Sequence, residues 1–263
     1  MKKRTIPSFI YEDTTDPNVK RFVDRDGNWT HYWLVKEKRF VKAVNHILSI
    51  GYAKSAGFYE YLKRVTPEES ERRLKNGGEE GTRTHIAIRE LAAGNRISMT
   101  TRLYDDRTGK QEVLNNDEWD NLEAYKNFLT DYPQEFVAEE RTVYSSEASY
   151  AGTFDRLAVI KVPEDDDKFP KEVRGKKVFV LIDWKTSSGA WDEYHAQIAA
   201  YWYAIIEHQH YKNFREHYPC FGMIVRLGTR HKSGYELTVF TEDDMRSNFM
   251  HFLSAQQLTR VKP

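Results

Sequence analysis

An aspartate and a lysine two residues apart, at the end of an apolar stretch, form the strongest chemical signal in the chain. Residues 178–182 read VFVLI, and Asp183, Trp184 and Lys185 follow them. Because side chains alternate along a strand at about 3.3 Å per residue, Asp183 and Lys185 would share one face, about 7 Å apart. A carboxylate and an ammonium group placed there could act on one substrate atom. A structural ion pair is the alternative, but burying charges at the end of an apolar strand costs free energy unless a polar group or a metal ion compensates them.

A second carboxylate lies in the apolar segment that precedes this strand. Asp155 falls within residues 150–160. The loop between this segment and residues 177–186 is of moderate length, which favours an antiparallel pair of strands. Asp155 and Asp183 would then converge on one hard cation. Taken alone, Asp155 is equally compatible with a turn cap or with an ion pair to Arg156.

Composition restricts both the metal and the mode of binding. Cys220 is the only cysteine, so Cys-based zinc sites and four-cysteine iron–sulfur clusters are excluded. Two carboxylates, an imidazole and water suit Mg²⁺ or Mn²⁺. The 40 Lys and Arg residues balance the 40 Asp and Glu residues, so any nucleic-acid binding must come from local placement of basic side chains.

The segments that must position these residues alternate between strand and helical periodicity. The Asp26-Gly27 pair separates two aromatic, β-branched stretches and predicts a β-hairpin. The Gly77-Gly78 pair predicts a break before a helix that carries His85 and ends at Gly94. Strands are expected over residues 136–144, 150–160, 177–186, 220–227 and 235–240. Helices are expected within 40–63, after Thr66, over 116–133 and 191–210, and from 241 onward.

Chain length and apolar runs predict a folded protein without a membrane span. With 263 residues and 14% aromatic side chains, the chain can bury a sizeable core in one domain with decorations. The longest unbroken apolar run, residues 198–206, is far short of the roughly 18 residues that a membrane helix needs. Glu12 and Asp13 follow the basic start before an apolar region forms, so no signal peptide is expected.

Four short motifs occur in an order that is typical of one nuclease group. They are GTRTH at 81–85, GTFD at 152–155, DWK at 183–185 and QIAAY at 197–201. In this order the chain resembles the PD-(D/E)XK nuclease superfamily, and within it the RecB-like exonuclease branch, which includes phage exonucleases and the mitochondrial genome-maintenance exonuclease. Each motif alone is weak, whereas four in order over roughly residues 80–205 form a strong signal.

The resemblance implies a fold and an activity. The fold would be α/β, with a restriction-endonuclease-like core of a mixed central sheet flanked by helices over residues 81–263. Residues 1–80 would form an N-terminal hairpin and helical lead-in packed on that core, in one compact domain. The activity would be metal-dependent exonucleolytic hydrolysis of DNA, on single strands or free ends, in replication, recombination or DNA degradation. The expected location is the cytoplasm of a bacterial or phage-infected cell, with no membrane association. DNA is the expected partner, and a replication or recombination protein is a possible second one.

The resemblance also assigns metal-binding and catalytic roles. Mg²⁺ or Mn²⁺ would be held by His85, Asp155, Asp183 and the backbone carbonyl of Trp184. Lys185 would orient or help to deprotonate the attacking water and, with Asp155 and Asp183, would complete the catalytic set. An isolated histidine such as His85 is more often an ordinary helix residue, and only its motif favours a ligand.

Four further residues are implied as substrate contacts. Gln197 and Tyr201 are one helical turn apart, so both could reach the DNA backbone or a base. Thr186 and Ser187 follow the lysine directly and could donate hydrogen bonds to phosphate. Without the D-x-K strand before it, the aromatic helix that carries Gln197 and Tyr201 would be interpreted as core.

Several questions stay open at the level of sequence. Arg89 stands where many relatives carry a glutamate, the nearest acid is Glu90, and neither is assigned a role. Glu140 either matches a family acid or is a surface strand residue. An endonuclease of the same superfamily and a non-catalytic DNA-binding protein with the nuclease fold are alternative functions. Intact Asp155, Asp183 and Lys185 count against the second, because a degenerate member would be expected to lose at least one of them.

Overall fold

The computed structural model describes residues 9–261 except 25–29, 55, 106–108, 188, 190 and 230. Nine strands among these residues form one mixed sheet in the order β1-β2-β3-β4-β8-β9-β10-β11, with β7 paired to β8. The strands of this sheet are β1 (Phe9–Asp13), β2 (Val19–Asp24), β3 (Thr30–Leu34), β4 (Arg39–Ala43), β7 (Gln134–Ser145), β8 (Tyr150–Lys161), β9 (Lys177–Lys185), β10 (Cys220–Leu227) and β11 (Tyr235–Phe240). A separate small ribbon joins β5 (Leu103–Asp105) to β6 (Lys110–Glu112).

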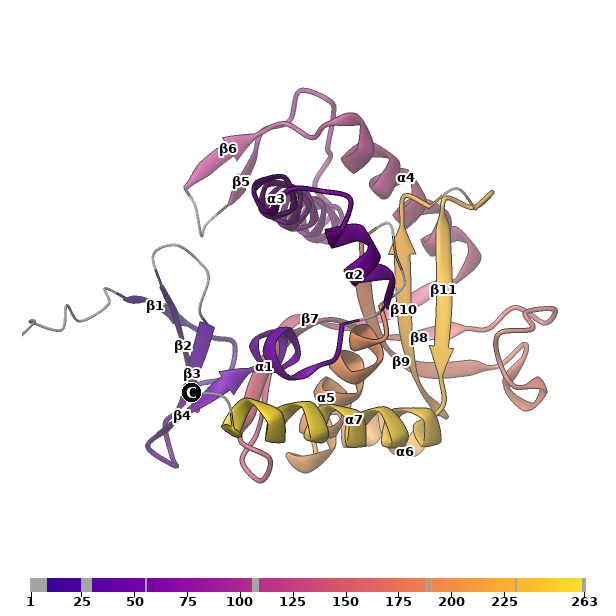
Figure 1. The fold of residues 1–263 in the computed structure, drawn as a ribbon. Coiled ribbons are helices and arrows are strands. Elements are labelled where there is room, and N and C mark those ends of the chain that lie inside the picture. Colours follow the sequence, from indigo (N-terminus) through magenta and orange to yellow (C-terminus); the bar gives the residue numbers. More distant parts are fainter. Residues whose placement is uncertain are drawn as a thin grey trace, which may run out of the picture.

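Helices cover both faces of this sheet (Figure 1). They are α1 (Val44–Gly51), α2 (Ala56–Leu62), α3 (Pro67–Ala92), α4 (Asn116–Asp131), α5 (Glu193–Glu207), α6 (Lys212–His217) and α7 (Glu242–Val261), with a short 3-10 helix at Lys171–Val173. One core cluster joins the sheet to α1, α5 and α7, and a second joins its other face to α3 and α4. The predicted α/β class, with a mixed central sheet flanked by helices, is confirmed.

The strands that carry the two aspartates pair as predicted. β8 runs antiparallel to β9, with Arg156 opposite Ile182, and β9 runs parallel to β10. Along β9, Phe179 packs in one core cluster and Val180 in the other. Both faces of the strand are therefore covered, which explains its unbroken apolar run. Asp183 continues the face of Phe179, which is the face covered by α5.

Two predictions about the N-terminal third are wrong in detail. Residues 39–43 form β4 instead of the start of a helix, because Val41 and Ala43 alternate into a buried cluster while β4 pairs with β3 and β8. Four residues are too few to distinguish a period of 2 from one of 3.6. The predicted break at Gly77-Gly78 is absent, since α3 continues through both glycines and through residue 80.

The predicted hairpin is present as the antiparallel pair of β2 and β3, with Val23 opposite Thr30. Its Asp26-Gly27 turn lies outside the described residues. These strands belong to the same sheet as β8, because Lys42 and Ala43 of β4 pair with the start of β8. Among the described residues, no helix is long and apolar enough to cross a membrane.

Candidate metal centre

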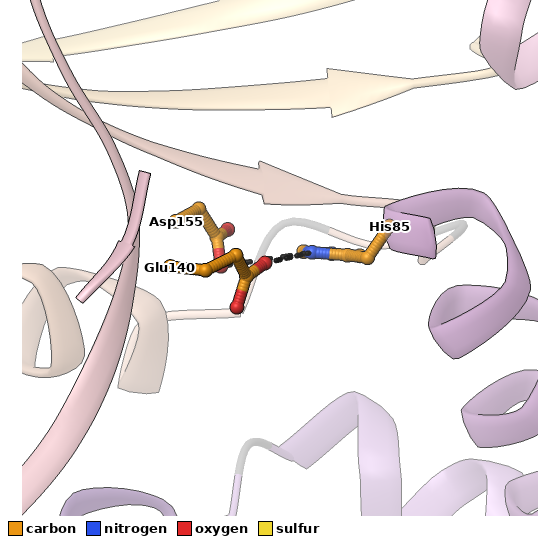
Figure 2. A group of neighbouring side chains, drawn as sticks. All are labelled: His85, Glu140 and Asp155. Carbon is orange, nitrogen blue, oxygen red and sulfur yellow. Dashed lines mark ion pairs between the residues drawn. The ribbon is translucent and has the colours of Figure 1, made fainter. Parts of the chain in front are cut away.

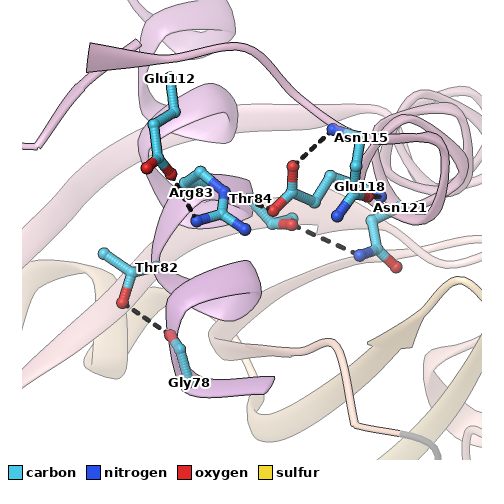
Figure 3. Close-up of polar contacts among 8 residues, drawn as sticks. All are labelled: Gly78, Thr82, Arg83, Thr84, Glu112, Asn115, Glu118 and Asn121. Carbon is cyan, nitrogen blue, oxygen red and sulfur yellow. Dashed lines mark hydrogen bonds and ion pairs between the residues drawn. The ribbon is translucent and has the colours of Figure 1, made fainter. Parts of the chain in front are cut away.

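Helix α3 is anchored to α4 and β6 by a polar network just before His85 (Figure 3). Arg83 donates from Nε to Glu118 Oε1 at 2.6 Å and from Nη1 to Glu112 Oε2 at 2.8 Å. Asn121 donates to the Thr84 hydroxyl at 3.3 Å. The Glu118 carboxylate is fully buried, and charge-assisted bonds of this kind hold their geometry well. The network therefore sets the rotation of α3 about its axis and, with it, the direction of the next residues.

One helical position after this network, His85 meets two carboxylates from the sheet (Figure 2). Its Nδ1 lies 3.6 Å from Asp155 Oδ1 on β8 and 3.9 Å from Glu140 Oε1 on β7. One ligand atom from each of the three residues lies within 4.8 Å of the others, and all three side chains are partly buried. The structure thus brings together predicted ligands His85 and Asp155 and adds Glu140, whose role the sequence had left open.

Glu140 reaches this cluster through an unusual backbone conformation. Its φ is +49°, in the left-handed region that few residues other than glycine adopt. The residues on either side of Glu140 pair with the residues on either side of Asp155, which places the two acids across from each other on neighbouring strands. A strained backbone of this kind persists where the surroundings hold it, and it is enriched at functional sites.

The charges in the cluster perturb one another strongly. Burial lowers the pKa of His85, but the negative charges of Asp155 and Glu140 outweigh it and raise the pKa to about 9. Burial raises the pKa of Asp155 to about 7, and the charges of Asp183 and Glu140 add to this effect. A divalent cation would relieve the repulsion among these carboxylates, and its binding to His85 would require the imidazole to lose its proton.

Lys185 is held beside the cluster by a chain of polar contacts. Its Nζ lies 2.7 Å from Asp183 Oδ2 and donates to Gln197 Oε1 at 2.9 Å. Gln197 in turn donates from Nε2 to the Tyr201 hydroxyl at 3.1 Å. A Cβ at Gly152 would lie only 2.5 Å from the Tyr201 ring, so the glycine makes room for that ring. Three of the four sequence motifs are therefore joined in one packed unit.

The predicted substrate contacts divide into two groups. Thr186 and Ser187 line a cleft of about 1230 Å³ together with His85 and Lys185. Gln197 and Tyr201 are buried and do not line that cleft. Gln197 contacts Lys185, and Tyr201 contacts Gln197. The reason is geometric, because the buried stripe of α5 is the face that meets β9.

Tyr194, on the aromatic helix α5, lines the cleft and has no role in the sequence-based prediction. Lys185 Nζ lies 4.6 Å from the centre of its ring, and its hydroxyl donates to Ser187 Oγ at 3.1 Å. Tyr194 precedes Gln197 by three residues, so the two share one face of α5. That spacing is the signal that could have identified Tyr194.

Trp184 connects the metal cluster to the opposite face of the sheet. Its backbone N–H donates to Asp155 Oδ2 at 2.8 Å, which leaves Oδ1 directed at His85. Its indole lies 5.5 Å from the guanidinium carbon of buried Arg156, which lies equally close to the Tyr125 ring. Arg156 Nη1 donates a hydrogen bond to the Tyr125 hydroxyl at 2.8 Å. Asp183, by contrast, directs Oδ2 at Lys185 and is almost fully buried.

Neither a protein-family model nor a curated protein sequence matches this chain.

The residues present fit a hard divalent cation. An imidazole nitrogen and two carboxylates converge without a thiolate, and this set suits Mg²⁺ or Mn²⁺. His85, Glu140 and Asp155 are the residues that would hold the ion. The predicted ligand Asp183 is not in this group of three, because its Oδ2 is directed at Lys185, although its charge acts on Asp155. Trp184 contacts Asp155 through its backbone N–H.

Proposed function

We propose that this protein is a metal-dependent deoxyribonuclease, an exonuclease with a PD-(D/E)XK core of the RecB-like type. One observation carries the proposal: the His85, Glu140 and Asp155 cluster and the ammonium group of Lys185 border the same cleft. A cation site and a fixed positive charge side by side match the needs of phosphodiester hydrolysis, in which negative charge develops on the phosphate.

Each side chain has a definable task in this reaction. When bound, a divalent cation lowers the pKa of a water molecule and offsets charge on the scissile phosphate. Burial lowers the pKa of Lys185, but the charges of Asp183 and Asp155 outweigh it and raise that pKa, so the side chain stays an ammonium group. It can therefore orient water and donate to a phosphate oxygen. Thr186 lines the cleft and can donate a further hydrogen bond. The Ser187 hydroxyl donates to the Gly189 carbonyl at 2.8 Å and would have to turn from it to reach a phosphate.

Cleavage assays on defined DNA test the proposal. The purified protein would be incubated with Mg²⁺ and with end-labelled linear or closed-circular DNA, single-stranded and double-stranded. We expect linear DNA to be degraded and EDTA to stop the reaction. Asp155→Asn and Lys185→Met should each slow cleavage at least about 10²-fold, whereas Asp120→Asn, on the exposed face of α4, should not.

The possible results separate the candidate functions. Cleavage of closed circles would indicate an endonuclease of the same superfamily. DNA binding without cleavage in Mg²⁺ or Mn²⁺ would indicate a non-catalytic DNA-binding protein and would refute the proposal. Near-normal cleavage by Asp155→Asn or Lys185→Met would refute the assigned site.

A further inference from the structure

One wall of the cleft is built from residues that precede the metal cluster in the chain. Lys54 and Phe58 of the α2 region line it, followed along α3 by Arg73, Gly77 and Gly78. None of these residues contributes to the cluster itself. The cleft therefore extends beyond the reacting groups and offers a surface for parts of a substrate that do not react.

The two glycines have no structural explanation within α3. They lie inside a 26-residue helix, where each glycine is less favourable than alanine by about 0.8–1.0 kcal/mol. Neither has positive φ, and a Cβ at either position would meet open space, so neither backbone conformation nor packing requires glycine. Gly81 differs, because its Cβ would lie 3.3 Å from Thr186 Oγ1, where α3 approaches the end of β9. What Gly77 and Gly78 provide is bare helix backbone on the cleft wall.

An aromatic ring stands on the same wall. Phe58 is partly exposed and lines the cleft, with Lys54 Nζ 6.0 Å from the centre of its ring. Bases of a single strand can stack on such a ring whatever their sequence, whereas the bases of a duplex are already stacked on one another. An aromatic ring beside a phosphodiesterase site thus provides affinity for unpaired bases.

Basic side chains accompany the ring and the glycines. Lys54 and Arg73 are paired with Glu193 and Glu69, each at 2.7 Å. Arg89, one helical turn beyond His85, is exposed in the cleft and makes no ion pair within the described part of the chain. Acidic side chains such as Glu80 and Glu193 line the cleft as well, so these basic groups offer individual contacts to phosphates and not a uniformly positive surface.

We propose that this wall, formed by Lys54, Phe58, Arg73, Gly77 and Gly78, is a seat for single-stranded DNA. A base stacks on Phe58, and the strand passes close to α3 where Gly77 and Gly78 carry no side chain. The basic side chains follow the backbone, and the strand leads to the metal cluster. The seat rests on the proposed nuclease function for the direction of the strand, but binding to it requires no cleavage.

Binding without cleavage tests the seat. Fluorescence anisotropy in EDTA would measure the affinity of the full-length protein for a labelled oligo-dT strand and for a blunt hairpin duplex. Phe58→Leu should weaken binding of the single strand about 5- to 150-fold, the factor that corresponds to loss of one base–aromatic stack. Phe58→Trp should retain it. Tyr59→Leu is the matched control, because Tyr59 is exposed on the same helix and does not line the cleft.

A second pair of variants tests the bare stretch of α3. Gly78→Leu should fill the cleft wall and weaken binding of the single strand at least about tenfold, while raising the thermal midpoint, because leucine favours the helix. Asn76→Leu, exposed on the same helix and outside the cleft, should leave binding unchanged.

Three results would overturn the seat. They are failure of the unchanged protein to bind the single strand, equal affinities of Phe58→Leu and Tyr59→Leu, and an equal loss of affinity for strand and duplex in Phe58→Leu. Binding and cleavage together distinguish failure of the seat from failure of the nuclease proposal. If the protein binds single strands through Phe58 but never cleaves DNA, the nuclease proposal is refuted and the seat is supported. If it cleaves DNA but binds it independently of Phe58, the seat is refuted and the nuclease proposal is supported.

Discussion

Replacing Glu140 by glycine should make the metal-free protein more stable and at the same time impair its metal site. Glu140 holds φ of +49°, and an L residue in that region is strained by about 1–2 kcal/mol, whereas glycine adopts it without steric cost. Glycine also loses about 0.5–1 kcal/mol in backbone entropy on folding. The difference leaves a net stabilisation of about 0.5–1 kcal/mol.

The same substitution removes one of three converging ligands. Its carboxylate lies 3.9 Å from His85 Nδ1, within reach of an ion shared with Asp155, and no neighbouring acid can replace it from the same position. We therefore expect the Kd for Mn²⁺ to rise at least about tenfold. Stability and metal affinity would then change in opposite directions, which a simple packing defect would not produce.

Two measurements and one control define the experiment. Thermal unfolding in EDTA should show a midpoint about 1–4 °C higher for Glu140→Gly, and calorimetric titration with Mn²⁺ should show the weaker binding. Lys38→Gly is the control, because Lys38 also has positive φ, at +50°, and is exposed in the turn between β3 and β4. It should gain similar stability with unchanged affinity. A lower midpoint for Glu140→Gly, or unchanged Mn²⁺ affinity, would refute the reasoning.

Three further predictions follow from the contacts around the cluster. Gly152→Ala places a Cβ 2.5 Å from the Tyr201 ring, so it should displace Tyr201 and the Gln197 side chain that holds Lys185. We expect single-turnover cleavage to slow about 10²-fold with little change in Mn²⁺ affinity, and unchanged cleavage would contradict this. Arg156→Lys loses the planar group that contacts two rings, so the Kd for Mn²⁺ should rise about tenfold; an equal Kd would show that Arg156 serves packing alone. Mn²⁺ affinity should increase as pH rises from about 6 to 9, because binding requires proton loss from His85, whose pKa is raised to about 9; a flat profile by calorimetry would exclude the histidine as ligand.

The central strands could be predicted from sequence because their signals are local. The run from Val178 to Ile182 is long and uninterrupted, and both faces of β9 are covered by helices. Pairing of β8 with β9 followed from the apolar character of both strands and the moderate length of the loop between them. The positions of Asp155 and Asp183 depend only on that pairing, so they were predictable too.

Glu140 could not be placed in this way. Its role depends on a left-handed backbone conformation at a residue that is neither glycine nor asparagine. It also depends on the pairing of its two neighbours with the neighbours of Asp155 on the next strand. The burial of Gln197 depended on which face of α5 meets β9, which helical periodicity alone does not determine. The helix through Gly77 and Gly78 contradicts local propensity, and such local contradictions are expected where a function uses them.

The most direct test of the central claim is an anomalous diffraction map from crystals of the protein soaked in Mn²⁺. The claim is that His85, Glu140 and Asp155 form a site for a divalent cation beside Lys185. We predict an anomalous peak among these three side chains, within about 2.6 Å of a carboxylate oxygen of Asp155. A bound ion located elsewhere in the cleft, or no peak at a Mn²⁺ concentration that supports DNA cleavage, would contradict the account.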